Sequence, residues 1–140
     1  MIKELKTIIC AVLAAMLCAL NGCSSLSQME YREYKQLEKQ GVDINHPIGD
    51  YIPPNSLILA GVLNLLPGFG NFYLALGEGS KGEHAVFGFI NLLFWPISIV
   101  WGVPEAAFDA NNLNKIDMLY YYRYSPDGKK ALEQRGIKLD

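Results

Sequence analysis

The sequence predicts a small all-α protein in which a central apolar helical hairpin is flanked by short amphipathic helices. Apolar residues make up 51% of the 140-residue chain and are concentrated in uncharged stretches. Two of these stretches are separated by a short glycine-rich connection, which favours an antiparallel pair of helices. On both sides of this pair, charged segments with apolar residues at helical spacing end at a glycine, as capped surface helices do.

The first 22 residues have the pattern of a secretory signal. Lys3 and Lys6 precede a stretch without charge, residues 7–20, that is rich in aliphatic residues. A charged start followed by an apolar region too short for a comfortable membrane span is typical of a signal peptide. The alternative is an uncleaved anchor helix that is followed by a cysteine by chance.

The sequence Leu20-Asn21-Gly22-Cys23 closes this segment. It resembles the lipobox of bacterial lipoproteins, which has an aliphatic residue three places before the cysteine and a small residue directly before it. The resemblance implies cleavage before Cys23, a lipid on its sulfur and acylation of the new amino terminus, so that several chains hold the protein at a membrane. Cys10 and Cys18 leave with the signal, and no intramolecular disulfide can then form.

The remaining residues are enough for one small domain. Loss of two lysines and one glutamate with the signal moves the formal net charge from −2 to −3. A slightly acidic chain has no electrostatic footprint for nucleic acid. We expect four segments: the signal (1–22); a polar tether, short helix and proline-rich linker (23–55); an apolar hairpin (56–104); and an amphipathic helix, tyrosine-rich segment and C-terminal helix (105–140).

Residues 29–40 are predicted to form the first helix, which is charged on most of its surface. Gly41 is expected to end it in the left-handed conformation. Val42 would then contact Leu37, as in the Schellman motif. The apolar side of this helix is expected to carry Tyr31, Tyr34 and Leu37.

Two uncharged blocks, residues 57–76 and 85–103, occupy the middle of the chain. As one helix, either block would be roughly 28–30 Å long, which matches the hydrocarbon core of a bilayer, so membrane association is expected. Pro67 is predicted to divide the first block into two half-helices, and Pro96 is predicted to kink the second. The short connection at 77–84 is flexible and favours an antiparallel hairpin.

Pro104 and Glu105 are predicted to begin a further helix. The run 119–124 follows, and its four tyrosines suit a half-buried, wet surface against lipid headgroups or against the first helix. Ser125 and Pro126 are predicted to be the N-cap and first residue of a last helix, which should end near Gly136 as the first ends at Gly41.

Residues 59–109 contain Gly68-Phe69-Gly70, then Phe72-Tyr73-Leu74, a glycine-rich turn and a second apolar block with Trp101. This order resembles the TM2 domain, a short two-helix membrane hairpin. The resemblance implies a hairpin. It implies no activity, because the family has no settled one.

The sequence gives little support for catalysis, and we expect neither an enzyme nor a cofactor. His46 and His84 are the only histidines, both in predicted loops with no cysteine nearby, so we expect surface positions and not metal ligation. No Gly-x-Ser-x-Gly motif occurs, and the glycine pairs are too short for a phosphate-binding loop.

Three amides inside the apolar blocks are the candidate intramembrane polar contacts: Asn64, Asn71 and Asn91. We expect them to bond to one another or to backbone groups freed by Pro67, as packing contacts. The alternative is that they line a polar path or bind a lipid headgroup.

Together these features predict a lipid-anchored cell-envelope protein with a structural or protein-interaction role, using its hairpin in or on the bilayer. Its partners would be membrane lipid, other envelope proteins or a second copy. One alternative is a soluble lipid-binding lipoprotein. Another is a small pore-forming or permeabilising protein that oligomerises through Gly61, Gly68, Gly70 and Gly88. The resemblance to lipoproteins of the enterobacterial kind implies the outer membrane, because the residue after Cys23 is Ser24 and not Asp. Two helical spans would instead favour the inner membrane.

Overall fold

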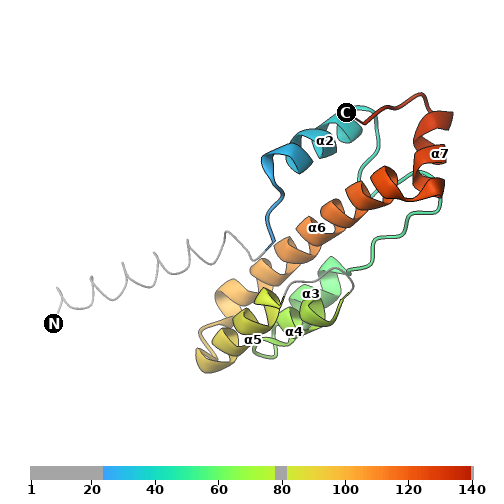
Figure 1. The fold of residues 1–140 in the computed structure, drawn as a ribbon. Coiled ribbons are helices and arrows are strands. Elements are labelled where there is room, and N and C mark those ends of the chain that lie inside the picture. The colour runs from blue at the N-terminus through green and yellow to red at the C-terminus, as the bar shows by residue number, and fades with distance from the viewer. Residues whose placement is uncertain (1–23, 78–81, 140) are drawn as a thin grey trace.

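A computed structural model describes residues 24–77 and 82–139. The expected signal and Cys23 lie outside the described residues. Within those residues all regular secondary structure is helical, which confirms the all-α prediction. The spine of the fold is the 26-residue helix α6 (Ile99–Tyr124), and the other helices pack along its two halves (Figure 1).

Helix α2 (Gln28–Lys39) begins and ends through local hydrogen bonds. At its start the Ser27 hydroxyl accepts from the Glu30 N–H at 3.2 Å, and the Glu30 carboxylate accepts from the Ser27 N–H at 2.7 Å. At its end Gly41 has φ +77°, and the Val42 N–H donates to the Leu37 carbonyl at 3.0 Å. The predicted Schellman motif is therefore confirmed.

The C-terminal helix α7 (Pro126–Gln134) uses the same chemistry. The Ser125 hydroxyl caps its start, and Pro126 is its first residue, as predicted. Gly136 has φ +69°, and the Ile137 N–H donates to the Leu132 carbonyl at 3.0 Å. Both short helices are thus delimited by their own sequence.

The first apolar block forms two helices, as predicted: α3 (Leu57–Leu63) and α4 (Phe69–Leu76). The turn between them contains Pro67 and reverses the chain at Gly68, which has φ +79°. A side chain at Gly68 would also collide with the backbone of Gly88, so glycine is required there for two reasons.

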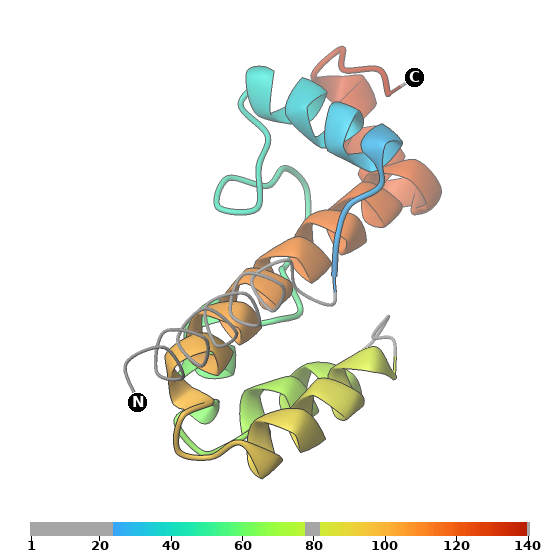
Figure 2. The same cartoon turned by 90° about the vertical axis from the view of Figure 1, so that its left-hand side faces the viewer.

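The second apolar block does not form one kinked helix, and that prediction was wrong. Helix α5 (Glu83–Leu93) ends before Pro96, the chain turns, and α6 begins at Ile99 antiparallel to α5 (Figure 2). Pro96 has no N–H to donate, and its ring would clash with the preceding helical turn. In this protein the helix ends there and does not continue past a kink. The predicted helix start at Pro104 was also wrong, because α6 continues through this proline to Tyr124.

No helix among residues 24–77 and 82–139 combines the length and apolar character needed to cross a bilayer. The expected association of the two blocks with a membrane stays a prediction. Breaks near Pro67 and Pro96 divide the blocks into α3, α4 and α5, of seven, eight and eleven residues, and the start of α6.

Two units share α6. The tyrosine unit comprises residues 26–51 and 113–139, with α2 and α7 packed on the C-terminal half of α6. Its buried core is apolar and consists of Tyr34, Leu37, Val42, Ile48, Tyr51, Met118, Leu119, Tyr122, Ala131, Leu132 and Ile137. The hairpin unit comprises residues 57–76 and 83–110, in which α3 and α4 pack on the N-terminal half of α6 and α5 packs on α4. Its buried apolar cluster holds only Ala60, Leu74, Ala106 and Ala110.

Tyrosines in the tyrosine unit divide between core and surface. The Tyr122 side chain is buried, and its hydroxyl accepts from the Ile48 N–H at 2.8 Å and donates to the Ile48 carbonyl at 3.0 Å. Tyr120 and Tyr124 are exposed, and so is Tyr31, which was expected on the packed side of α2. An ion pair between Arg123 and the buried Glu33 joins α6 to α2.

Candidate functional site: a polar interior in an apolar shell

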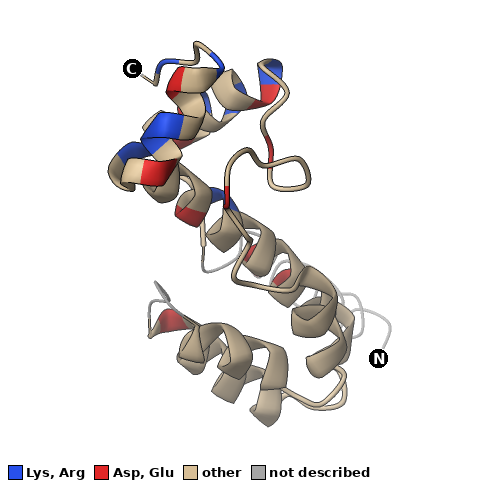
Figure 3. Ribbon diagram, turned by 90° about the vertical axis from the view of Figure 1, so that its right-hand side faces the viewer, with Lys and Arg blue, Asp and Glu red and all other residues tan. Residues whose placement is uncertain are grey.

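The hairpin unit carries its large apolar side chains on the outside. At the turn between α5 and α6, Leu93 is 80% exposed and Trp95 is 57% exposed. The exposed set continues over all four helices and includes Ile58, Val62, Leu65, Leu66, Phe69, Val86, Phe89, Leu92, Phe94, Ile97, Val100 and Phe108. No Asp, Glu, Lys or Arg occurs in 51–77 or 84–104. In Figure 3 the Lys and Arg residues gather instead at the other end of the molecule.

Inside the same unit the three predicted asparagines meet. Asn71 is the centre, because its Oδ1 accepts from Nδ2 of Asn64 at 2.7 Å and from Nδ2 of Asn91 at 2.9 Å. Asn64 also donates to the carbonyl of Gly102 at 2.5 Å and accepts from the N–H of Gly70 at 2.8 Å. All three side chains are buried. They bond to one another and to backbone, and so connect α3, α4, α5 and α6.

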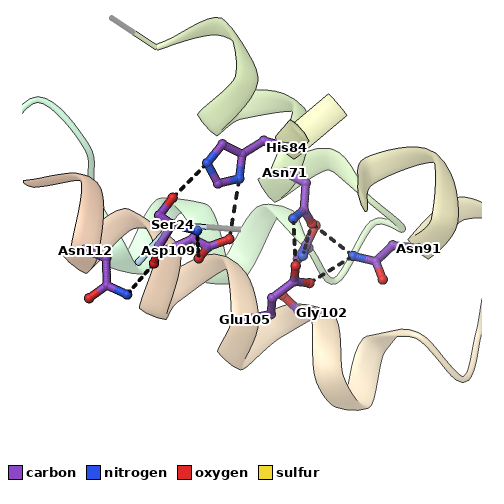
Figure 4. A network of polar contacts seen from close by, with 9 residues as sticks. Ser24, Asn71, His84, Asn91, Gly102, Glu105, Asp109 and Asn112 are labelled. Carbon is purple, nitrogen blue, oxygen red and sulfur yellow. Dashed lines mark hydrogen bonds and ion pairs between the residues drawn. The ribbon is translucent and has the colours of Figure 1, made fainter. Parts of the chain in front are cut away.

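A buried carboxyl group completes this network. Glu105 lies beside the asparagines, with its carboxylate oxygens 3.4 Å from Nδ2 of Asn71 and 3.4 Å from Nδ2 of Asn91 (Figure 4). Burial raises the pKa of Glu105 to about 7, and the nearby charge of Asp109 also raises it, while the hydrogen bonds from the two amides oppose the shift. Glu105 therefore exchanges its proton near neutral pH.

Sequence reasoning missed Glu105 because it placed this residue at the start of a surface helix. A signal was available in the spacing of small residues. Gly102, Ala106 and Ala110 recur every four positions, which marks one close-packed face of a helix. Glu105 and Asp109 directly precede two of these small residues and are buried with them.

A second polar contact lies at the opposite end of α5 and involves Ser24 (Figure 4). The Ser24 N–H donates to Oδ1 of Asp109 at 3.1 Å, and the Ser24 hydroxyl lies 3.0 Å from Nε2 of His84. Nδ1 of His84 lies 3.4 Å from Oδ2 of Asp109. Nδ2 of Asn112 donates to the Ser24 carbonyl at 2.7 Å. Every polar atom of Ser24 is thus in contact with α5 or α6.

His84 was expected on the surface of a loop, and this prediction was wrong. It lies in the first turn of α5 and is buried, as is Asp109. Ser24 and His84 are 60 positions apart in the chain, and Ser24 and Asp109 are 85 apart. No local pattern could indicate such contacts. His46, in contrast, is exposed as predicted.

Ser24, His84 and Asp109 contact one another in the order found in nucleophilic hydrolases. Two features separate this contact from a catalytic centre. Asp109 divides its oxygens between the imidazole and the N–H of Ser24 itself, and Ser24 is only 6% exposed. A nucleophile must reach a substrate carbonyl that is held by oxyanion donors. The geometry therefore fits a buried contact that stabilises the packing better than it fits a catalytic centre.

Three of the four glycines considered for oligomerisation are used within the chain. A Cβ on Gly88 would lie 2.6 Å from the ring of Phe72, and one on Gly68 or Gly70 would collide with backbone of α5 or α3. A Cβ on Gly61 would lie 3.5 Å from a carbonyl of α6. Gly68, Gly70 and Gly88 thus allow close packing inside the hairpin unit, whereas a Cβ on Gly61 would make an ordinary contact. The pore-forming alternative therefore loses three of the four glycines on which it depended.

No family model, curated protein or solved structure matches this chain. The lipobox and TM2-like resemblances therefore stay predictions, and the function has to be argued from the geometry.

Proposed function

We propose that this protein is a lipid-anchored envelope protein whose hairpin unit inserts into one leaflet of a bilayer. The tyrosine unit would remain in water, available to other envelope proteins, and the role is structural and not enzymatic. The observation that carries this proposal is the inverted polarity of the hairpin unit, which has amides and carboxyl groups inside and large apolar side chains outside.

Inverted polarity is unfavourable in water and favourable in lipid. Soluble monomers rarely expose contiguous apolar patches larger than a few hundred Å². In a bilayer the same side chains meet acyl chains, while buried amides that bond to one another need no water. The hydrogen bonds of Asn64, Asn71 and Asn91 are of this internal kind.

The dimensions favour one leaflet. The eleven residues of α5 extend about 16 Å, which is close to half of a hydrocarbon core of about 30 Å. The turns at 64–68 and 94–98 lie at the same end of the unit (Figure 2). Both turns expose apolar side chains, including Leu66 and Trp95. We therefore place the turns deepest, and the charged end, which starts near Glu83 and Asn112, at the surface.

A one-leaflet anchor also bears on location. The argument for the inner membrane depended on spanning helices. The outer membrane indicated by Ser24, with the protein on its periplasmic face, is the location that we propose. The soluble alternative is less well supported, because the large apolar side chains of the hairpin unit are exposed.

Tryptophan fluorescence tests the insertion. The two tryptophans of the chain, Trp95 and Trp101, both lie in the hairpin unit. A Trp101→Phe variant in vesicles leaves Trp95 as the only reporter, at the turn proposed to be deepest. We expect lipids brominated near the acyl ends to quench it several-fold more than lipids brominated near the headgroup. A Trp95→Phe variant is the control for depth, because Trp101 lies farther from the turn.

The opposite result would be quenching of Trp95 by aqueous iodide with no effect of brominated lipid. It would place the hairpin unit outside the hydrocarbon. Because Trp101→Phe also removes the 2.7 Å hydrogen bond to Oδ1 of Asn91, the helical content of the variant must first be shown to equal that of the unchanged protein.

A further inference from the structure

Ser24 is held more completely than a tether residue needs to be. Its N–H, carbonyl and hydroxyl contact Asp109, Asn112 and His84 respectively. Removing the polar atoms of a serine from water is costly unless each finds a partner. Here each does, and the partners come from the start of α5 and the middle of α6. We call these four residues, Ser24, His84, Asp109 and Asn112, the amino-terminal clamp.

The position of the clamp along the hairpin unit is specific. It lies at the end opposite the exposed turns, since His84 is in the first turn of α5 and Asp109 is eleven helical residues into α6. Glu83 directly precedes His84 at the start of α5. The Lys and Arg residues gather at the other end of the molecule (Figure 3). With the turns placed in the acyl region, the clamp is at the depth of the lipid headgroups.

The residue before Ser24 is the one predicted to carry lipid. Consecutive Cα atoms are about 3.8 Å apart, so the attachment point is one residue away from the clamp. A lipid on a free tether and an inserted hairpin unit would bind the membrane as loosely coupled groups. A lipid attached next to the fixed Ser24 is confined close to the hairpin unit. Once one of the two groups is in the membrane, the effective concentration of the other at the membrane is therefore higher.

We propose that the amino-terminal clamp holds the lipid-bearing end of the mature chain against the hairpin unit, so that lipid and hairpin unit enter the same leaflet as one bivalent anchor. This inference rests on the proposed function, because it needs both an inserted hairpin unit and a lipid on Cys23. The ligand of the combined site is the interfacial region of a phospholipid leaflet, with the acyl chains leaving at the depth of Ser24.

The test opens the clamp and measures retention. A Ser24→Ala/Asn112→Ala double variant removes the hydroxyl contact with His84 and the amide contact with the Ser24 carbonyl. The matched control is Ser25→Ala/Asn111→Ala, which changes the same residue types one position away from each clamp residue. Full-length lipidated protein, with its lipid verified by mass spectrometry, is placed in donor vesicles, and its transfer to acceptor vesicles is followed. We expect transfer of the double variant to be at least about tenfold faster, and the control to behave as the unchanged protein.

Making the same variant with and without the lipid shows whether the clamp couples the lipid to the hairpin unit or whether the variant only destabilises the hairpin unit. The same double variant is made in a matched chain that begins at position 23 and carries Cys23→Ser. Without a lipid there is nothing for the clamp to couple, so opening it should change dissociation from vesicles by less than about twofold. An equally large effect in this background would overturn the proposal, because the variant would then act only by loosening the hairpin unit.

The remaining outcomes are also informative. If Trp95 is not quenched by brominated lipid even in the unchanged protein, the proposed function fails, and the bivalent anchor fails with it. If Trp95 is quenched and both lipidated variants transfer at the rate of the unchanged protein, the clamp alone is overturned. Labelling of Ser24 by a fluorophosphonate, absent in Ser24→Ala, would likewise overturn it by making the serine a reactive nucleophile.

Discussion

The two units of this protein are built on one continuous helix and distribute polarity in opposite ways. In the tyrosine unit, Leu37 and Val42 are buried and charged residues cover the surface. In the hairpin unit, Asn71 and Glu105 are buried and leucines and phenylalanines cover the surface. Both arrangements satisfy the same two requirements, that buried polar groups have partners and that apolar surface avoids water. This difference is the ground on which we propose that the two halves of α6 face different solvents.

The largest expected effect is a difference in unfolding free energy between two leucine-to-alanine variants, one in each unit. Leu37→Ala empties a fully buried position of the tyrosine unit and should lower the free energy of unfolding by about 2–5 kcal/mol. Leu93→Ala in the hairpin unit should lower it by less than about 0.5 kcal/mol in detergent, because that side chain has few protein neighbours to lose. Denaturant unfolding of both variants measures the contrast. Similar losses at the two positions would mean that Leu93 is packed inside the protein.

The next effect is a pH dependence that belongs to the hairpin unit. The pKa of Glu105 is about 7 when folded, against an ordinary value of 4.5, so between these pH values the folded state binds more protons than the unfolded state. The contribution of Glu105 to stability should therefore be greatest below pH 4.5 and fall by about 3 kcal/mol as the pH rises to about 7. Glu105→Gln should remove most of this slope. Thermal unfolding in detergent from pH 5 to pH 8 provides the measurement, and an unchanged slope in the variant would assign it to another group.

A smaller effect should follow from removing the centre of the amide network. Asn71→Leu keeps the branching and the number of side-chain heavy atoms and leaves Nδ2 of Asn64 and Asn91 without their shared acceptor, which should cost about 2 kcal/mol. Asn45→Leu, at an exposed loop position of the tyrosine unit, is the matched control and should change stability little. Hydrogen exchange of the α4 and α5 amides reports the loss locally. Protection equal to that of the unchanged protein would show that the network contributes no stability.

The smallest effect compares Gly136 of the tyrosine unit with Gly82, the residue directly before α5. Gly136 has φ +69° and open space around it, so Gly136→Ala meets only backbone strain and should cost about 1 kcal/mol. Gly82 also has open space but has φ −56°, so Gly82→Ala should be neutral or slightly stabilising. Melting temperatures of the two variants are the measurement. Equal melting temperatures would show that the C-terminal cap frays without cost.

Local chemistry made part of this fold predictable from the sequence. The ends of α2 and α7 depend on Ser, Pro and Gly at fixed positions and on hydrogen bonds that span at most five residues, so short patterns identify them. The break at Pro67 follows from the missing N–H of proline. The effect of Pro96 was harder to predict from the sequence, because a kinked helix and a helix that ends both lose the same backbone hydrogen bond. In the structure α5 packs on α4 and ends at Leu93, before Pro96.

The direction in which side chains face, and the partners of Ser24, His84 and Glu105, were decided by the tertiary structure alone. The sequence determined two uncharged blocks containing three amides, but an uncharged block gives the same pattern in a spanning helix, a soluble core or an inverted unit. Breaks at Pro67 and Pro96 bring four short helices together, and only then do Asn64, Asn71 and Asn91 have one another as partners. Contacts over 60 and 85 positions close around Ser24. Such contacts depend on how the helices pack, and the local spacing of residues in the sequence does not predict that packing.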